Sequence, residues 1–422
     1  MNKLSASKCI MLALSAGLIL NVNTVAAEAT LLLKQAEQIA LQRDPVLQAF
    51  NARSNAYQEQ AEAEDAWPDP RIKLGWMNFP TDTYDRRQEA MTQLQVGVEQ
   101  MIPRGDVNGL KSRRASDMAH VQLSGADERQ RKVRDEIRRA WLELFYWERT
   151  RVVVTRNRGY FSKLVDITQS QYAAGRQKQQ DVIRAQLELG MLDDRLSMID
   201  AKQESSRAEL EKWLGPELAR LSLPETLPAL PGVQLDEQQV LEHPVLKAEE
   251  ARVLASERGV ALARQGYKPQ WKLGVTYGQR DGVNPNGSER ADFVSGVISF
   301  DLPFATGFLR QGHKVAASKL ELDAARQTRI EKERELKRMW NIQRANWQRL
   351  GERVTHYDNL LIPKARENAK AAMSAYQSRR GDFTALMRAQ ITELETLLKG
   401  LRLKVDHKKT QAKLLYLAGE PQ

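Results

Sequence analysis

The stretch SQYAAGRQKQQDVIRAQLEL, residues 170–189, interrupts a long region that otherwise has the composition of continuous helix. A related stretch, SAYQSRRGDFTALMRAQITEL, occupies residues 374–394. In each stretch a tyrosine, Tyr172 or Tyr376, precedes an Arg-Ala-Gln triplet by twelve residues. We interpret each stretch as the reversal between two long antiparallel helices.

Other segments repeat in the same order, which indicates a chain built from two related halves. The offset is 199 for DPVL (44–47) and HPVL (243–246) and for PRIKLG (70–75) and PQWKLG (269–274), and it grows to 204 at the tyrosine stretches. A short span between the halves contains four prolines, which exclude helix and indicate a linker. We predict a signal peptide at 1–27, a first structural repeat at 28–215, a Pro-rich linker at 216–231 and a second structural repeat at 232–422.

Each half predicts a helix, two strands, a long helix, the tip turn and a final helix. Opening helices are expected at 45–66 and 244–265, long helices at 105–171 and 305–375, and a final helix at 177–213 with its counterpart in the second half. The first long helix alone would extend about 100 Å at roughly 1.5 Å per residue. Apolar residues in the final helices recur every three or four positions, which predicts coiled-coil seams. The predicted seam residues are Val182, Ala185, Leu189, Leu192, Leu196 and Ile199 in the first half and Met387, Ile391, Leu394, Leu398, Leu401 and Val405 in the second.

The strand segments alternate apolar and polar residues. In RIKLGWMNF (71–79) and WKLGVTYG (271–278) every second side chain is apolar, and segments near 94–99 and 294–300 repeat the pattern less cleanly. This period of two is typical of a sheet with one apolar face. The sheet could pack on the helices, or its strands could cross a membrane with the apolar face towards lipid. Four strands cannot close a membrane barrel, so the second alternative requires an oligomer.

The first 27 residues have the order of a secretory signal peptide. Lys3 and Lys8 precede an apolar run that ends at Leu20, and small residues lead to a cleavage point after Ala27. No later apolar stretch is long enough for a membrane-spanning helix. Cys9 is the only cysteine, so the mature chain has no disulfide and no lipid-accepting thiol.

The formal net charge of +10 does not predict nucleic-acid binding, because basic and acidic residues alternate along the helices. No phosphate-binding loop, nucleophile elbow, zinc-protease motif or calcium loop is present. We therefore expect no enzyme activity, no catalytic residues, no cofactor and no metal site. Two rival functions remain, a periplasmic coiled-coil adaptor and an enzyme. An adaptor would not need two amphipathic strand pairs. An enzyme would need a convergent polar pocket, which the sequence does not show.

Signal peptide, twofold repeat, two strands per half and rods that end in QYAAGRQKQQDV together resemble the TolC family of outer-membrane efflux channels. The segment WPDPRIKLGWMNF is most similar to the heavy-metal efflux branch. The resemblance implies a mainly α fold with a β-barrel portion. It implies long coiled-coil helical hairpins, four transmembrane β-strands per chain, and a trimeric α/β-barrel channel in the cell outer membrane with a large periplasmic helical tunnel.

The implied function is the exit duct of a tripartite efflux system that carries heavy-metal cations. The implied partners are two further copies of the chain, outer-membrane lipid, a periplasmic adaptor (membrane fusion protein) and an inner-membrane pump. A drug-efflux channel or a type I secretion channel is the alternative.

The resemblance also implies that the hairpin tips close the tunnel. The candidate tip or gate residues are Tyr172, Gly175, Asp181, Arg184, Tyr376, Arg380, Asp382 and Arg388. Relatives often have acidic residues nine and twelve positions after the second tyrosine, whereas this chain has Ala385 and Arg388. We hypothesise a mixed ionic latch that involves Asp181, Arg380, Asp382 and Arg388; a solvated tip that only contacts the adaptor is the alternative.

Overall fold

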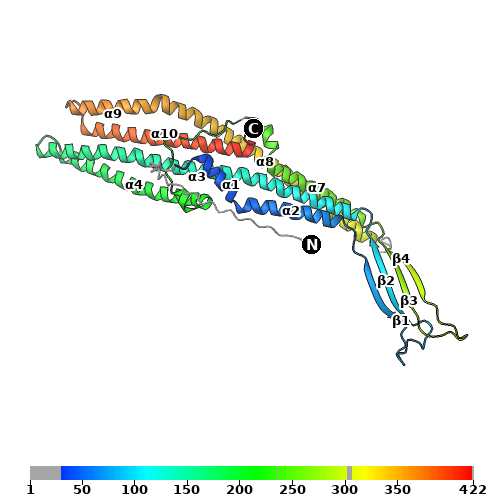
Figure 1. Ribbon diagram of the computed structural model, residues 1–422. Coiled ribbons are helices and arrows are strands. Elements are labelled where there is room, and N and C mark those ends of the chain that lie inside the picture. The colour runs from blue at the N-terminus through cyan, green and yellow to red at the C-terminus, as the bar shows by residue number, and fades with distance from the viewer. Residues whose placement is uncertain (1–29, 234, 302–306, 421–422) are drawn as a thin grey trace, which may run out of the picture.

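The computed structural model describes residues 30–233, 235–301 and 307–420. It shows a long helical body with the two hairpin tips at one end and a β-sheet at the other (Figure 1). The predicted signal peptide at 1–27 lies outside the described residues. Among the described residues, no helix is both long enough and apolar enough to cross a membrane.

The two halves have the same order of major elements. The first contains α1 (Leu33–Arg43), α2 (Pro45–Asp65), β1 (Arg71–Met77), β2 (Gln93–Ile102), α3 (Val107–Ala173), α4 (Gln179–Leu214) and α5 (Pro216–Ala219). The second contains α6 (Gln238–Leu241), α7 (Pro244–Gln265), β3 (Trp271–Gln279), β4 (Phe293–Phe300), α8 (Gly307–His356), η1 (Tyr357–Leu361), α9 (Ile362–Gln377) and α10 (Phe383–Ala418). The division into repeats at 28–215 and 232–422 remains a prediction from the sequence.

Three expectations about the helices were wrong in part. Helix α1 precedes α2 and was not predicted, because its first turn has no side-chain cap to mark it. The predicted linker is not free of helix, since Pro216 occupies the first position of α5, where proline is tolerated. The second long helix is not continuous, because the π-helical segment η1 separates α8 from α9.

Helix α3 runs the length of the body, with α2 beside one part of it and α4 beside the rest (Figure 1). A core near the middle packs α1 and α4 on α3 around Trp141, which is fully buried and donates from Nε1 to the carbonyl of Leu31 over 3.1 Å. A second core joins the two tip hairpins. Its buried members include the predicted seam residues Ala185, Leu192, Ile199, Met387, Leu394 and Leu398. The coiled-coil seams are therefore confirmed.

The four strands form one antiparallel sheet in the order β1-β2-β3-β4. The two strand pairs come from different halves of the chain, and β2 pairs with β3 to join them. The register aligns the apolar positions across the sheet: Ile72 pairs with Val98, Val98 with Val275, and Leu273 with Ile298. One face is therefore apolar across all four strands.

Candidate functional site: the sheet face and the hairpin tips

The apolar face of the sheet is uncovered in the described chain. Ile72, Leu74 and Val294 are 74%, 74% and 75% exposed. Further exposed apolar side chains on this face are Trp76, Val96, Val98, Val275, Tyr277, Ile298 and Phe300. Exposure of so many large apolar side chains on one surface marks a contact with lipid or protein. The sheet does not pack on the helices, so the first of the two alternatives for these strands is wrong.

The opposite face of the sheet carries most of the polar side chains. It carries Lys73, which pairs with Glu99 at 2.5 Å, together with Thr276, Ser295 and Ser299. Gly97 lies so close to Thr276 that a Cβ there would be 2.7 Å from Thr276 Oγ1. Strands β1 and β4 are the edges of the sheet, and the outer side of each is unpaired within the described residues. An unpaired edge presents free N–H and C=O groups to another strand.

Both hairpin tips turn with the same backbone hydrogen bonds. In the first, the Gly175 amide donates to the carbonyl of Tyr172 over 2.9 Å, and the Arg176 amide donates to Gln171 over 2.8 Å. Gly175 has a φ of +68°, the left-handed conformation that favours glycine. The second tip places Arg379 in this conformation, with a φ of +59°. The predicted reversals at both tips are confirmed.

Two predicted tip residues connect the hairpins. Arg184 donates from Nη1 to Thr384 Oγ1 over 2.9 Å, and the Tyr376 hydroxyl donates to Gln171 Oε1 over 2.9 Å. Burial raises the pKa of Tyr376, and the nearby Asp181 carboxylate raises it further. Sequence reasoning missed Gln171 and Thr384, because no spacing in the sequence signals a contact between separate hairpins.

The acidic candidates have local roles. Asp181 accepts a hydrogen bond from Gln177 Nε2 at 2.7 Å, and Asp382 caps α10 by accepting from the Ala385 amide. Both carboxylates line a groove between the tips, which Tyr376 also lines. Two tip hairpins therefore present adjacent acidic groups at the end of the body.

The remaining candidates lie at the surface of the tip. Tyr172 is half-exposed at the end of α3, and Arg380 and Arg388 are exposed. No ion pair joins Asp181, Arg380, Asp382 and Arg388 within the described part of this chain. The mixed ionic latch stays a prediction, and its ion pairs would have to form between chains or after a movement of the tip.

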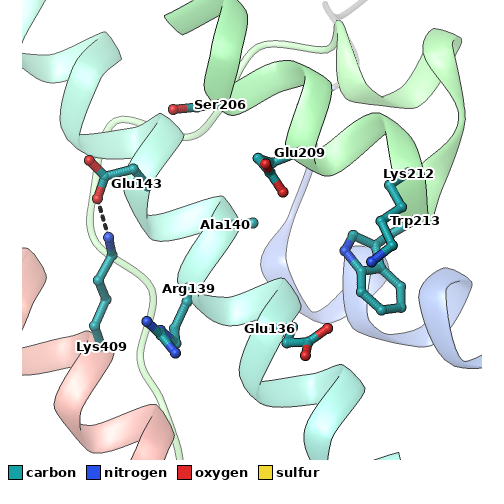
Figure 2. Close-up of a pocket in the computed structure, with 9 residues that line it drawn as sticks. All are labelled: Glu136, Arg139, Ala140, Glu143, Ser206, Glu209, Lys212, Trp213 and Lys409. Carbon is teal, nitrogen blue, oxygen red and sulfur yellow. Dashed lines mark hydrogen bonds and ion pairs between the residues drawn. The ribbon is translucent and has the colours of Figure 1, made fainter. Parts of the chain in front are cut away.

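A second groove lies midway along the body between α3, α4 and α10. Figure 2 shows Glu143 of α3 paired with Lys409 of α10. Glu143 also accepts from Arg402 at 3.0 Å, and these two cations lower its pKa although burial alone would raise it. Lys212 lies over the ring of Trp213 at 4.5 Å. The ion pairs of Glu143 join α3 to α10, so this carboxylate has a structural role.

The described residues contain no group of three or more His, Cys, Asp or Glu side chains arranged to hold a metal ion. Neither groove brings together a nucleophile, a base and a group that orients the base.

Residues 36–216 match the family described as outer membrane efflux protein. This match covers less than half of the chain, and over these residues the chain is similar to the outer membrane efflux proteins. No curated protein sequence matches the chain significantly. The match indicates no catalytic family, and members of the efflux family are transport ducts.

Solved structures of outer-membrane channels share the fold over most of the chain. OprN is 17% identical, with 92% of this chain and 90% of OprN covered and a TM-score of 0.77. VceC from Vibrio cholerae is 16% identical, with 92% of this chain and 96% of VceC covered and a TM-score of 0.76. CusC is 12% identical, covers 92% of both chains, and has a TM-score of 0.77. The predicted resemblance to the TolC family is confirmed.

The family match and the shared fold bear out two further expectations for this chain. The fold is mainly α with a β-portion built on long helical hairpins. The location is the outer membrane, with the helical body as a periplasmic tunnel.

Proposed function

We propose that this protein is an outer-membrane efflux channel that acts as a homotrimeric exit duct. Three chains would contribute four strands each, β4 of one chain pairing with β1 of the next, to form a twelve-stranded transmembrane barrel. The observation that carries this proposal is the uncovered apolar face of a sheet whose two outer edges are unpaired within the described residues. Closure would satisfy both edges and place the apolar face in lipid.

The helical body would continue the barrel into the periplasm. The hairpin tips lie at the end of the body opposite the sheet, so they face away from the outer membrane (Figure 1). We propose that they meet a periplasmic adaptor, which links the duct to an inner-membrane pump. The charged and amide side chains that line the tip groove suit polar contacts with such a partner. No nucleic acid is expected among the partners.

We propose heavy-metal cations as the substrate. Support comes from the segment WPDPRIKLGWMNF, which is most similar to the heavy-metal efflux branch of the family. A duct conducts what its pump delivers, so it needs neither a metal site nor a catalytic group of its own. A drug-efflux channel or a type I secretion channel would use the same architecture with another pump.

Two experiments test this proposal. Sedimentation and detergent fractionation should place the protein in the outer membrane as a trimer, and a soluble periplasmic product would overturn the channel and favour a coiled-coil adaptor. Cells that lack the gene should accumulate copper, silver, zinc or cobalt, and the restored gene should reverse this. Retention of an efflux dye with unchanged metal content would instead assign the duct to drug efflux.

A further inference from the structure

The charged residues of the four described strands all lie on one face of the sheet. These residues are Arg71, Lys73, Glu99 and Lys272. Arg71 lies opposite Glu99 in the register, Lys73 is two residues from Arg71, and Lys272 lies opposite Ser299, so all four belong to the polar face. Three cations and one carboxylate leave a net charge of +2 per chain on this face.

The three cations surround the single carboxylate. Lys73 Nζ lies 2.5 Å from Glu99 Oε2, and the Lys73 side chain is 60% exposed. Arg71 is directly across from Glu99, and Lys272 is two residues from Gly274, which pairs with Glu99 on the other side. All three cations interact electrostatically with this carboxylate. Glu99 can neutralise one of them, so the group stays positive.

The four charges lie at the end of the sheet that joins the helical body (Figure 1). Arg71 is the first residue of β1, Glu99 is three residues before the end of β2, and Lys272 is the second residue of β3. Further along, the same face carries uncharged polar side chains, which are Gln93, Gln95, Thr276 and Ser295. The positive charge is therefore confined to one level of the sheet.

Charges next to this level balance one another. The charged residues between the strands and the helices, with their partners, occur in equal numbers of both signs: Arg104 and Asp301, Arg113 and Asp106, Lys268 and Asp69. The first two sets are ion pairs. The net charge of the junction is therefore that of the four strand residues.

Like charges on the wall of a passage act on the ions that cross it. A cleft lined by one sign of charge with low-dielectric walls concentrates ions of the opposite sign, and rings of arginine or lysine occur in pores for anions. In membrane barrels, the residues that face the lumen tune its selectivity. Three chains of the proposed duct would repeat the cluster around the lumen at one level.

We propose that Arg71, Lys73 and Lys272 form a cationic belt in the lumen at the body end of the barrel, and that this belt favours anionic species in the exit passage. The position of the belt in a lumen rests on the proposed function, but the positive sign of the polar face does not. A heavy metal would cross this level more readily as a complex whose anionic ligands cancel or reverse the charge of the ion than as a bare cation.

The sign of the charge on the polar face is measured with single cysteines. Cys9, the only cysteine, lies in the predicted signal peptide, so an introduced cysteine supplies the only thiol of the mature chain. Gly274→Cys places it opposite Glu99, where a Cβ meets nothing closer than 3.8 Å. Met77→Cys places a reference thiol on the same face, four residues from Lys73. That separation is about 13 Å, beyond the screening length of about 8 Å at physiological salt.

Each purified protein is reacted with two methanethiosulfonate reagents of similar size, one with a sulfonate group and one with a trimethylammonium group. The ratio of the sulfonate rate to the trimethylammonium rate reports the sign of the local potential. We expect this ratio to be at least about threefold higher in Gly274→Cys than in Met77→Cys. Equal ratios in the two proteins would overturn the belt.

Charge variants combined with Gly274→Cys assign the effect to the belt. Lys272→Gln should lower the ratio and Glu99→Gln should raise it, whereas Lys272→Arg keeps the charge and should leave it unchanged. Arg87→Gln is the matched control, because it removes an exposed cation from the loop beyond the far end of the sheet. A ratio that responds to neither Lys272→Gln nor Glu99→Gln would also overturn the proposal.

A second position keeps the test decisive if Gly274→Cys does not assemble. Gly75→Cys places the thiol two residues after Lys73, where a Cβ meets nothing within 4 Å, and the same ratio is expected to exceed that of Met77→Cys. Both reagents report the charge at the thiol whether or not three chains close a barrel. Failure of the proposed duct, seen as a monomer in sedimentation, is therefore distinguished from failure of the belt.

Discussion

The Tyr376 hydroxyl hydrogen-bonds the side chain of Gln171 across 2.9 Å and joins the tip of the second hairpin to the tip of the first. Tyr376 also packs beside Phe383, with ring centroids 5.9 Å apart. Because burial raises the pKa of Tyr376, its hydroxyl keeps the donated proton well above neutral pH. The link is therefore independent of pH in the range where such a channel would operate.

Tyr376→Phe should loosen the connection between the tips while keeping the ring in place. One neutral hydrogen bond contributes about 0.5–1.5 kcal/mol, so the population of separated tips should rise about 2- to 10-fold. Single-channel recordings in planar bilayers would report this as more frequent opening. Tyr172→Phe is the control, since the Tyr172 side chain is half-exposed and does not bond the second hairpin in the described structure. Identical recordings for both variants would contradict this role of Tyr376.

Arg388→Ala tests the mixed ionic latch. Arg388 is exposed and makes no ion pair within the described chain, so its partner would belong to a neighbouring chain. We expect higher single-channel conductance and incomplete closure, with a small energetic effect because exposed ion pairs contribute about 0–1 kcal/mol. Arg388→Lys should retain most of the closure. Unchanged conductance and closure in Arg388→Ala would eliminate the latch and favour a tip that only contacts the adaptor.

Val294→Arg tests the assignment of the sheet faces. Val294 is 75% exposed on the apolar face, and an arginine facing the middle of a bilayer costs about 2–4 kcal/mol in a membrane barrel. The variant should assemble poorly in the outer membrane, as measured by the heat-modifiable trimer on gels.

Ser295→Arg supplies the matched control for this substitution. Ser295 is the next residue of β4 and lies on the opposite, polar face, so the variant should assemble normally. Equal assembly of the two variants would contradict the proposed orientation of the sheet.

Periodic features of the sequence were sufficient to predict the main elements. The two tyrosine stretches mark the reversals because Gly175 adopts positive φ and the seam residues fix the pairing of the helices. The strands were predicted because their apolar residues alternate. Both signals are local in the sequence, so they predict the elements without any knowledge of tertiary contacts.

Features that depend on contacts between distant segments were not predicted. The Tyr376–Gln171 bond connects side chains 205 positions apart, and the first core places α1 on α3 without a cap signal at Leu32. The π segment was also missed, because its residues continue the polar and apolar composition of a helix. The sequence signals it only through the numbering difference between equivalent residues of the two halves, which grows from 199 to 204 along the chain.

Asp44 combines two stabilising roles at the start of α2. It is buried, accepts from the Leu47 amide at 2.6 Å, and receives two hydrogen bonds from Arg129 at 2.7 and 3.2 Å. Burial would raise its pKa, but the Arg129 and amide hydrogen bonds outweigh burial and lower the pKa below 3.8. Asp44→Ala should lower the free energy of unfolding by about 2 kcal/mol, mainly through the lost cap.

The pH dependence of this contribution has a definite sign. Because the folded-state pKa of Asp44 lies below its unfolded value, its ionic contribution is present above about pH 4 and is lost as the pH falls through the folded-state pKa. The melting-temperature difference between wild type and Asp44→Asn, which keeps the cap, should shrink below pH 4. A constant difference down to pH 2 would show that the charge contributes nothing.

Arg138 holds together α1, α3 and the end of the chain, and it provides the most severe stability test. Its side chain is 4% exposed and bonds Glu37 at 2.7 Å and Glu420 at 2.7 Å. Arg138→Met leaves the Glu37 carboxylate without its partner, so we expect a loss of about 3 kcal/mol, the lower end for a broken buried pair. Adding Glu37→Leu removes the unpaired charge and should recover at least half of the loss in melting temperature. If the double variant instead melts lower than Arg138→Met, the ion pair itself is not the source of the loss, and the arginine acts through packing of its methylene chain.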